Sequence, residues 1–442
     1  MFLDSQMSGI IPIMFVILVI LIVIVILWVI NHRMTRYLNY NSTFVGSSLT
    51  QKSKFNPSDI YYTDNIELKT QEEKVKAYIL DYLHAPDNAV VIFNSGASES
   101  IANMMWWAKC MNRFGTVVGS VLDHPTVEEN ASNMSVNYLK LNYQQLQQKV
   151  IPLPDNTSMV FITGVCPRTG EIYPYQHIKQ YNYLNTQGDS LNTSHQFQPL
   201  MVLDASQMIG RKRIDMTRDK LNAVFFSCHK FGGEFNTGVL VISEPNPSYT
   251  FKPLIAGSQQ DHRRGGTYNV YAYLSLPKLL KQYEHEYKPE ECKQVYTSFA
   301  TMLASRGLHY YKPQLEHTYN TVLLTLTSCN AKLIHELSEY GIYVGSSTAC
   351  QHDNTVKELR ISYLNKQDIG RNTVKKIVNI IAKDESDIDA LDDGKKNQTG
   401  GTVSNDSSDD VASIDDDSSD IDSIDEHVQD LNDEIDFEDA YI

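Results

Sequence analysis

The 442-residue sequence predicts an α/β protein with a mostly parallel sheet, and three observations support this prediction. Short apolar runs alternate with longer segments, turn residues separate them, and polar side chains directly follow several of the apolar runs. This alternation is typical of a parallel sheet with helices on its faces, in which functional residues gather at the carboxyl ends of the strands. We therefore expect a large domain over residues 61–268 and a smaller C-terminal α+β domain over residues 269–383.

The expected elements of the large domain follow from the length and content of each run. Runs of four to six apolar residues predict short buried strands, and longer segments predict helices. The predicted strands are 89–94, 160–163, 200–203, 223–226 and 239–242, and the predicted helices are 67–83 and 98–109. After about residue 270 the pattern becomes helical, and a strand-like run at 321–326 begins the smaller domain.

A membrane anchor is predicted near the N-terminus, after a short segment of residues 1–9. Residues 10–30 contain no charged side chain, and 21 residues in a helix are long enough to span a hydrocarbon core of roughly 30 Å. Arg33 and Arg36 follow the segment and no basic residue precedes it, which predicts that the body of the protein faces the cytosol. Residues 31–60 then form an N-terminal arm. The alternative is a buried core helix.

The C-terminal segment, residues 384–442, has a composition unlike the rest of the chain. It contains 22 Asp and Glu residues but only two basic residues, Lys395 and Lys396, so it carries a net charge of −20. The whole chain carries −15, so the remaining residues carry +5. An Asp- and Ser-rich segment with few apolar residues is predicted to be disordered. It is either a solvating tail or a substrate for acidophilic kinases, and nothing in this charge distribution suggests nucleic-acid binding.

Six cysteines show no CxxC pair and no spacing typical of a zinc site, so we expect free thiols and no bound metal. Five are expected to be packing residues. Cys350 differs because it lies in the polar stretch GSSTACQH, which favours an exposed nucleophile over a buried packing residue.

Several predicted strands end in residues that suit one cofactor. Residues 95–98, SGAS, open a predicted helix, and a helix N-terminus with free backbone N–H groups favours a phosphate. Asp204 follows one strand and Lys230 follows another. Pyridoxal 5'-phosphate (PLP) requires an amine for a Schiff base, a carboxylate at its ring nitrogen and donors to its phosphate. The combination predicts a PLP site, whereas each residue alone is more often a solvated strand end.

The motifs FNSGASES, DHPTVEEN, LDASQMIGR and SCHK, in this order, resemble those of the cysteine desulfurase (NifS-like) family. The resemblance runs from about residue 37 to residue 382, and it implies the class V aminotransferase fold, which is fold type I of the PLP-dependent transferases. It also implies roles for the matching residues: the phosphate is bound by Ser98, Ser227 and His229, the ring by His124, Asp204 and Gln207, and the Schiff base is formed by Lys230. Ala97 is also expected to bind the cofactor.

Three further motifs lie toward the C-terminus and extend the resemblance to the substrate. RRGGTYNV implies that Thr267 reaches the phosphate of a partner subunit in a homodimer, VGSSTAC implies that Cys350 is the nucleophile, and ELRISY implies that Arg360 binds the substrate carboxylate. The implied reaction converts L-cysteine to L-alanine and leaves a persulfide on Cys350. The implied partner is a sulfur-acceptor protein, in iron–sulfur assembly or in a thio-modification.

The chain departs from the family pattern at two places. Pro167 stands where the family has an asparagine near the cofactor ring, and only nine residues separate Cys350 from Arg360. These departures keep two alternatives open, a catalytically impaired binding or scaffold protein and another PLP lyase such as a selenocysteine lyase. NifS-like proteins also occur in large DNA viruses, and the Asn-, Tyr- and Asp-rich composition is compatible with that origin.

Overall fold

The computed structural model describes residues 36–38, 63–111, 115–151, 153–178, 199–244, 250–327, 330–346 and 357–398. Within these ranges no helix is both long enough and apolar enough to cross a membrane. The predicted anchor at residues 10–30, most of the arm at 31–60, Cys350 and the tail beyond residue 398 lie outside the described residues.

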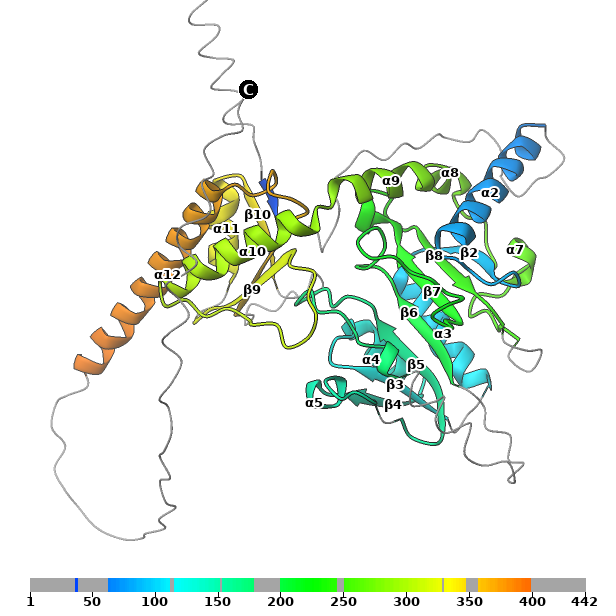
Figure 1. Cartoon of the computed structure of the whole chain (residues 1–442), viewed down its shortest axis with the longest axis horizontal. Helices are drawn as coiled ribbons and strands as arrows, with labels where there is room; N and C mark the ends of the chain where they lie inside the picture. The colour runs from blue at the N-terminus through cyan, green and yellow to red at the C-terminus, as the bar shows by residue number, and fades with distance from the viewer. Residues whose placement is uncertain are drawn as a thin grey trace, which may run out of the picture. The chain divides into compact units, whose positions relative to one another are not determined.

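A seven-stranded sheet forms the larger part of the described chain, in the order β2-β8-β7-β6-β5-β3-β4 (Figure 1). Only β8 runs antiparallel to its neighbours, β2 and β7, so the expectation of a mostly parallel sheet is confirmed. The strands are β2 Val90–Asn94, β3 Thr116–Ser120, β4 Asn137–Leu141, β5 Thr157–Thr163, β6 Leu200–Asp204, β7 Ala223–Ser227 and β8 Gly238–Ile242.

Successive residues of the central strands pack into two different hydrophobic clusters, because side chains alternate between the faces of a sheet. In β7, Val224 and Phe226 belong to one cluster, and Ala223 and Phe225 belong to the other. Helices supply the opposite half of each cluster, which is why β6 and β7 are apolar at every position before their last residue. These helices are α2 Thr63–Tyr82 and α9 Leu276–Glu286 on the first face, with α3 Ala97–Met111 and α4 Pro125–Asn133 on the second.

A four-stranded sheet, in the order β1-β10-β11-β9, forms the smaller part of the described chain. Its strands are β1 Arg36–Leu38, β9 Thr321–Thr325, β10 Ile342–Ser346 and β11 Glu358–Ser362, and β1 pairs in parallel with β10. Three helices contribute apolar residues to its core, α10 Pro289–Ala304, α11 Ala331–Glu339 and α12 Arg371–Gln398. Part of the predicted N-terminal arm is thus a strand of the smaller sheet.

The remaining short elements are α5 Tyr143–Leu146, the 3₁₀ turn η1 Cys228–Phe231, α7 Gln259–His262 and α8 Val270–Leu274.

Two predicted boundaries fall inside packed structure. The boundary at residue 269 precedes α8 and α9, yet Tyr273 of α8 stacks on Phe93 of β2 with ring centroids 4.0 Å apart, so these helices belong with the large sheet. The boundary at residue 384 falls within α12. Asp384 is buried there and pairs with Lys332 at 2.9 Å, a contact that the acidic composition of the segment does not reveal.

Candidate active site

The turn from β2 into α3 is built around Asn94, the last residue of β2. Its Oδ1 accepts a hydrogen bond from the Gly96 N–H at 3.0 Å, and its Nδ2 donates to Ser100 Oγ at 2.7 Å. Gly96 has a φ of +141°, which disfavours other residues. A Cβ on Gly238 of β8 would lie 2.4 Å from Gly96 Cα, so the turn lies close against the neighbouring strand. The positive end of α3 is therefore held at the carboxyl end of β2.

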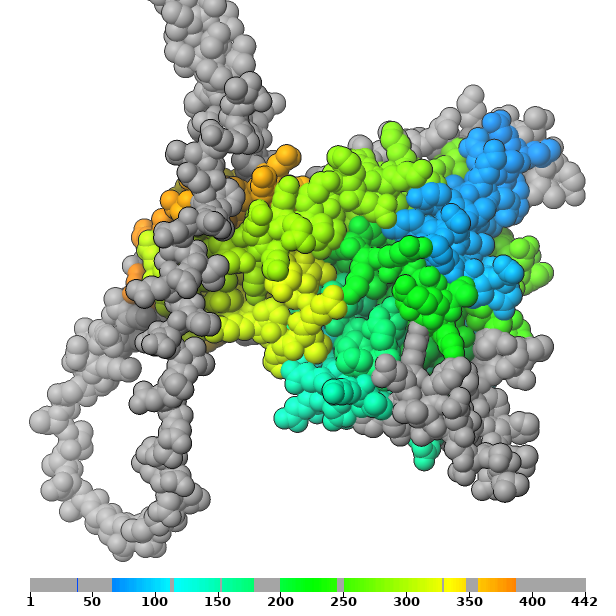
Figure 2. Space-filling view, in the orientation of Figure 1, coloured from blue at the N-terminus to red at the C-terminus, as the bar shows by residue number. Residues whose placement is uncertain are grey.

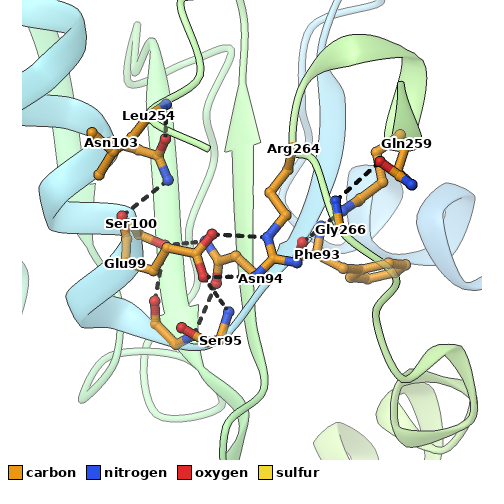
Figure 3. Close-up of polar contacts among 12 residues, drawn as sticks. Phe93, Asn94, Ser95, Glu99, Ser100, Asn103, Leu254, Gln259, Arg264 and Gly266 are labelled. Carbon is orange, nitrogen blue, oxygen red and sulfur yellow. Dashed lines mark hydrogen bonds and ion pairs between the residues drawn. The ribbon is translucent and has the colours of Figure 1, made fainter. Parts of the chain in front are cut away.

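An ion pair joins this turn to the segment that leads to Thr267 (Figure 3). Glu99 Oε1 accepts from Arg264 Nε at 3.0 Å, and Glu99 Oε2 accepts from the Ser95 N–H at 2.9 Å. Both paired side chains are largely buried. Burial alone would raise the pKa of Glu99, but the hydrogen bonds from Arg264 and Ser95 hold it below its ordinary value. The carboxylate therefore stays ionised and fixes the RRGGTYNV motif beside the turn.

The strand β7 ends at Ser227, whose Oγ accepts a hydrogen bond from the Ala97 N–H at 2.8 Å. The contact confirms that these two residues, 130 positions apart, meet at one edge of the sheet. Because the oxygen accepts from Ala97, the hydroxyl hydrogen of Ser227 is left to donate elsewhere. The turn η1 then presents Lys230, and the chain leaves it through Gly232 at a φ of +96°.

Asp204 is the last residue of β6, and its side chain is buried. Burial raises the pKa of this carboxyl, whereas hydrogen bonds from Ser206 and the charge of Lys230 oppose that rise. Its Oδ1 accepts from the Ser206 N–H at 2.9 Å. Gln207 is also buried, on the turn that follows β6. Asp204 and Lys230 therefore influence each other electrostatically at the ends of adjacent strands.

His124 is the N-cap residue of α4, and its Nδ1 accepts from the Thr126 N–H at 3.3 Å. Burial, together with the positive charges of Lys230 and Arg360, lowers its pKa below the ordinary value, so the imidazole is neutral at neutral pH. The same effects of burial and Lys230 lower the pKa of His229 to about 4. A neutral ring suits the predicted stacking role of His124.

Asp123 supports the turn that carries His124, and sequence reasoning did not single it out. Its carboxylate accepts from the Ser120 N–H at 2.7 Å, Thr163 Oγ1 at 2.8 Å and Tyr138 Oη at 2.9 Å. These partners lie on β3, β5 and β4, so one side chain joins three strands. Burial raises the pKa of Asp123 to about 6 despite these hydrogen bonds. The only sequence signal was an acid beside His124.

Arg360 comes from the smaller sheet, where it lies on β11 and is buried. Its Nη1 donates to the Pro167 carbonyl oxygen at 3.0 Å, on the segment that follows β5 of the large sheet. Because Arg360 influences the pKa of His124, as Lys230 does, the structure brings the predicted substrate-binding cation to the predicted cofactor site.

Three predicted site residues are not part of this cluster as the structure describes it. Ser98 lies in the first turn of α3 and is exposed, and Thr267 is exposed beyond Arg264. Cys350 lies outside the described residues, so its predicted role stays a prediction.

The residues present fit PLP. Lys230 supplies an amine, and the turn at 95–98 supplies the positive end of a helix. Asp204 supplies a buried carboxylate. Its pKa is raised by burial, and a protonated ring nitrogen beside it would lower that pKa again. His124 supplies a flat neutral ring at the same edge. This is the site of an enzyme class that uses the cofactor as an electron sink.

The chain belongs to the aminotransferase class-V family, whose model matches residues 48–371. Members of this family depend on PLP, in agreement with the cofactor predicted from the strand ends.

Curated relatives carry the name cysteine desulfurase. The chain is similar to "Cysteine desulfurase IscS" of Plasmodium falciparum, at 24% identity over 51% of this chain and 41% of the relative. It is also similar to "Cysteine desulfurase, mitosomal" of Trachipleistophora hominis, at 24% identity over 48% of each. The chain spans about half the length of the curated relatives it matches.

Solved structures show the same fold. A NifS-like protein matches with a TM-score of 0.66 and 19% identity, over 80% of this chain and all of that one. A NifS-like protein from Rickettsia africae matches with a TM-score of 0.58 and 17% identity, over 79% of this chain and 99% of that one. SspA, solved in complex with cysteine, matches with a TM-score of 0.55 and 17% identity, over 75% of this chain and 99% of that one.

Proposed function

We propose that this chain is a PLP-dependent cysteine desulfurase, which converts L-cysteine to L-alanine and transfers the sulfur to Cys350. The observation that carries the proposal is that Lys230, from the large sheet, and Arg360, from the smaller one, both act electrostatically on His124, and that Lys230 also acts on the buried Asp204. Lys230 and Asp204 suit the cofactor. Arg360 is a further cation, and it suits the carboxylate of a substrate that is itself an amino acid. The names of the curated relatives support cysteine as that amino acid.

Each side chain of the cluster has a distinct task in this reaction. Bound PLP supplies an electron sink for the substrate's Cα. Asp204 holds the proton of the ring nitrogen, and His124 packs against the ring as a neutral imidazole. Arg360 orients the substrate through its carboxylate. Lys230 moves protons at Cα and Cβ once the substrate amine has replaced it.

The sulfur transfer is assigned to Cys350, which lies outside the described residues. Its thiolate attacks the sulfur of the bound cysteine, so that a sulfur–sulfur bond forms and the Cβ–sulfur bond breaks. The electron pair of the broken bond stays with Cβ, which takes a proton and leaves as alanine. A sulfur-acceptor protein then receives the persulfide sulfur.

An absorbance titration of the purified full chain in detergent tests the proposal. Adding PLP should produce a bound-cofactor band that is absent in Lys230→Ala and present in Lys149→Ala, a control at an exposed lysine. L-cysteine should then yield alanine in the wild type and none in Cys350→Ser. A wild type that binds the cofactor but yields no alanine would overturn the desulfurase assignment.

One observation favours a second candidate, a binding or scaffold protein derived from this fold. Pro167 has no side-chain donor, and its carbonyl oxygen accepts from the arginine that would bind substrate. The same titration separates the two, because a scaffold protein requires no turnover. A selenocysteine lyase would instead release alanine from L-selenocysteine and not from L-cysteine.

We also propose that residues 10–30 anchor the chain in a membrane with the body on the cytosolic side. In cells, the full chain should sediment with membranes and resist carbonate extraction, and a chain without residues 1–31 should not. In sealed vesicles whose cytosolic face points outward, added protease should digest the body of the chain. A body that the protease leaves intact would contradict the proposed orientation.

A homodimer is proposed from the family resemblance, with Thr267 reaching the partner's cofactor. The exposed position of Thr267 is compatible with that role. Light scattering should give twice the chain mass after the detergent contribution is subtracted, and a monomer mass would contradict the dimer.

A further inference from the structure

Residues 165–172 form a hairpin between the two sheets, here called the connecting hairpin. Val165 and Ile172 form an antiparallel bridge, and the Cys166 N–H donates to the Glu171 carbonyl at 2.8 Å. The tip closes with a hydrogen bond from the Gly170 N–H to the Cys166 carbonyl at 2.9 Å. The hairpin follows β5 of the large sheet directly.

The base of the hairpin is anchored to the segment that leads into β9 of the smaller sheet. Glu171 is fully buried, and its carboxylate accepts from the Gln314 N–H at 2.6 Å, Tyr143 Oη at 2.8 Å and Tyr311 Oη at 3.0 Å. Figure 2 shows this yellow segment lying against the blue-green residues that follow β5. The hairpin therefore belongs to the packing of both parts of the chain.

The tip of the hairpin contacts β11 at two positions. Arg168 forms a two-pronged pair with the Glu358 carboxylate, with Nε to Oε2 at 2.9 Å and a second contact between Nη2 and Oε1. Arg360 donates to the Pro167 carbonyl oxygen. Glu358 and Arg360 are two residues apart on one strand, so their side chains point to the same face. Asn330 Nδ2 also donates to the Glu358 carbonyl at 2.6 Å, which holds this end of β11.

We propose that the Arg168–Glu358 pair is a latch that fixes β11 against the connecting hairpin and so sets the position of the Arg360 guanidinium. Arg168 and Glu358 are then positioning residues for the carboxylate of the substrate. This inference rests on the proposed function, because it concerns the place where an amino-acid substrate is held.

The geometry fits positioning better than general stabilisation. The Arg168 side chain is 42% exposed and that of Glu358 is 22% exposed, and ion pairs this close to solvent contribute little to the free energy of unfolding. A guanidinium that donates to both carboxylate oxygens fixes the relative orientation of the two side chains, whereas a single point charge does not. The hydrogen bonds to Glu358 also raise the pKa of Arg168, so the guanidinium stays charged at neutral pH.

If the latch positions Arg360, its loss should change KM much more than kcat in the full chain loaded with PLP. Arg168→Ala and Glu358→Ala should each raise KM for L-cysteine about 3- to 10-fold, with kcat within about twofold. The exchanged pair, R168E/E358R, should recover most of the loss, and Arg168→Lys should recover only part of it. Lys140→Ala breaks the Lys140–Glu128 pair, which is also partly exposed but lies away from the hairpin, and should change neither constant.

Amide hydrogen exchange supplies a readout that does not depend on activity. In the two single variants, exchange should become faster in residues 165–172 and 358–362 and should stay unchanged in β6 and β7. If the wild type releases no alanine, the proposed function is wrong. The hydrogen-exchange data would then still test the latch, because they do not depend on activity. Unchanged exchange in both segments, or single variants with an unaltered KM in an active enzyme, would overturn the latch.

Discussion

The two sides of the proposed active site are built in different ways. On the cofactor side, Asp204, Ser227 and Lys230 lie at or just beyond the ends of neighbouring strands, held by the sheet hydrogen bonds themselves. On the substrate side, Arg360 comes from another sheet, and its hydrogen bond to Pro167 crosses between the two parts of the chain. The first side is as rigid as the sheet, whereas the second depends on how the two parts pack.

Because of this difference, we expect substitutions on the two sides to have different effects. A substitution on the cofactor side should remove the cofactor or its electronic effect, and a substitution on the substrate side should weaken substrate binding in a protein that still holds the cofactor. The following changes test that division, in order of decreasing expected effect.

The largest effect is expected for Asp204→Ala, which removes the buried carboxylate at the end of β6. Without that charge the ring nitrogen of PLP loses its partner, and kcat for alanine release should fall at least about 100-fold. Asp87→Ala, at an exposed loop position, should leave kcat unchanged. Steady-state alanine production measures both, and a loss of less than tenfold would contradict the assigned role.

Arg360→Ala should separate the two sides of the site. The loss of a charge-assisted contact to the substrate carboxylate should raise KM for L-cysteine about 10- to 100-fold, while the bound-cofactor band stays. Arg360→Lys keeps a buried charge if the alanine variant fails to fold, and it should also raise KM because it cannot bind both oxygens in one plane. If a folded Arg360 variant loses the bound-cofactor band, the claim that Arg360 acts on substrate binding and not on cofactor binding is contradicted.

Gly170→Ala should destabilise the connecting hairpin. The residue has a φ of +81°, and a Cβ there would lie 2.8 Å from His317 Nε2. We expect a loss of about 2–3 kcal/mol in the free energy of unfolding, from backbone strain together with the steric contact.

Gly307→Ala is the matched control, because its φ is +67° and no atom would lie within 4 Å of the new Cβ. It should cost only the backbone part, about 1 kcal/mol. Urea denaturation measures both variants, and equal losses would show that the contact with His317 is unimportant.

The smallest effect is a pH dependence that originates from Asp123. Its ordinary pKa of 3.8 is raised to about 6 in the folded chain, so the folded state binds the proton more tightly. The resulting stabilisation is complete below about pH 4 and is lost as the pH rises through 6. The free energy of unfolding of wild type should therefore fall relative to Asp123→Asn, by about 1–2 kcal/mol between pH 4.5 and 7, given the partial exposure of the side chain. A pH-independent difference would show that Asp123 is already ionised at pH 4.5.

The sequence alone determined the central strands and the residues that follow them. Runs such as those of β6 and β7 are apolar at every position because both faces of the sheet are covered, and that local pattern needs no knowledge of the rest of the chain. The strand ends then place Asp204 and Lys230 at a common edge. Family motifs added the expectation that Arg360 would meet them.

Only the tertiary structure decided which distant residues meet. β3 and β4 were not predicted: β4 is mostly exposed and lacks an apolar run, and β3, although buried throughout, has only two adjacent apolar residues in its sequence TVVGS. The pairs Glu99–Arg264 and Arg168–Glu358 join residues 165 and 190 positions apart. A charged side chain in a sequence looks the same whether it faces solvent or a partner, since pairing depends on the path of the chain. The cofactor side was therefore predictable from local patterns, and the contacts that hold the substrate side in place were not.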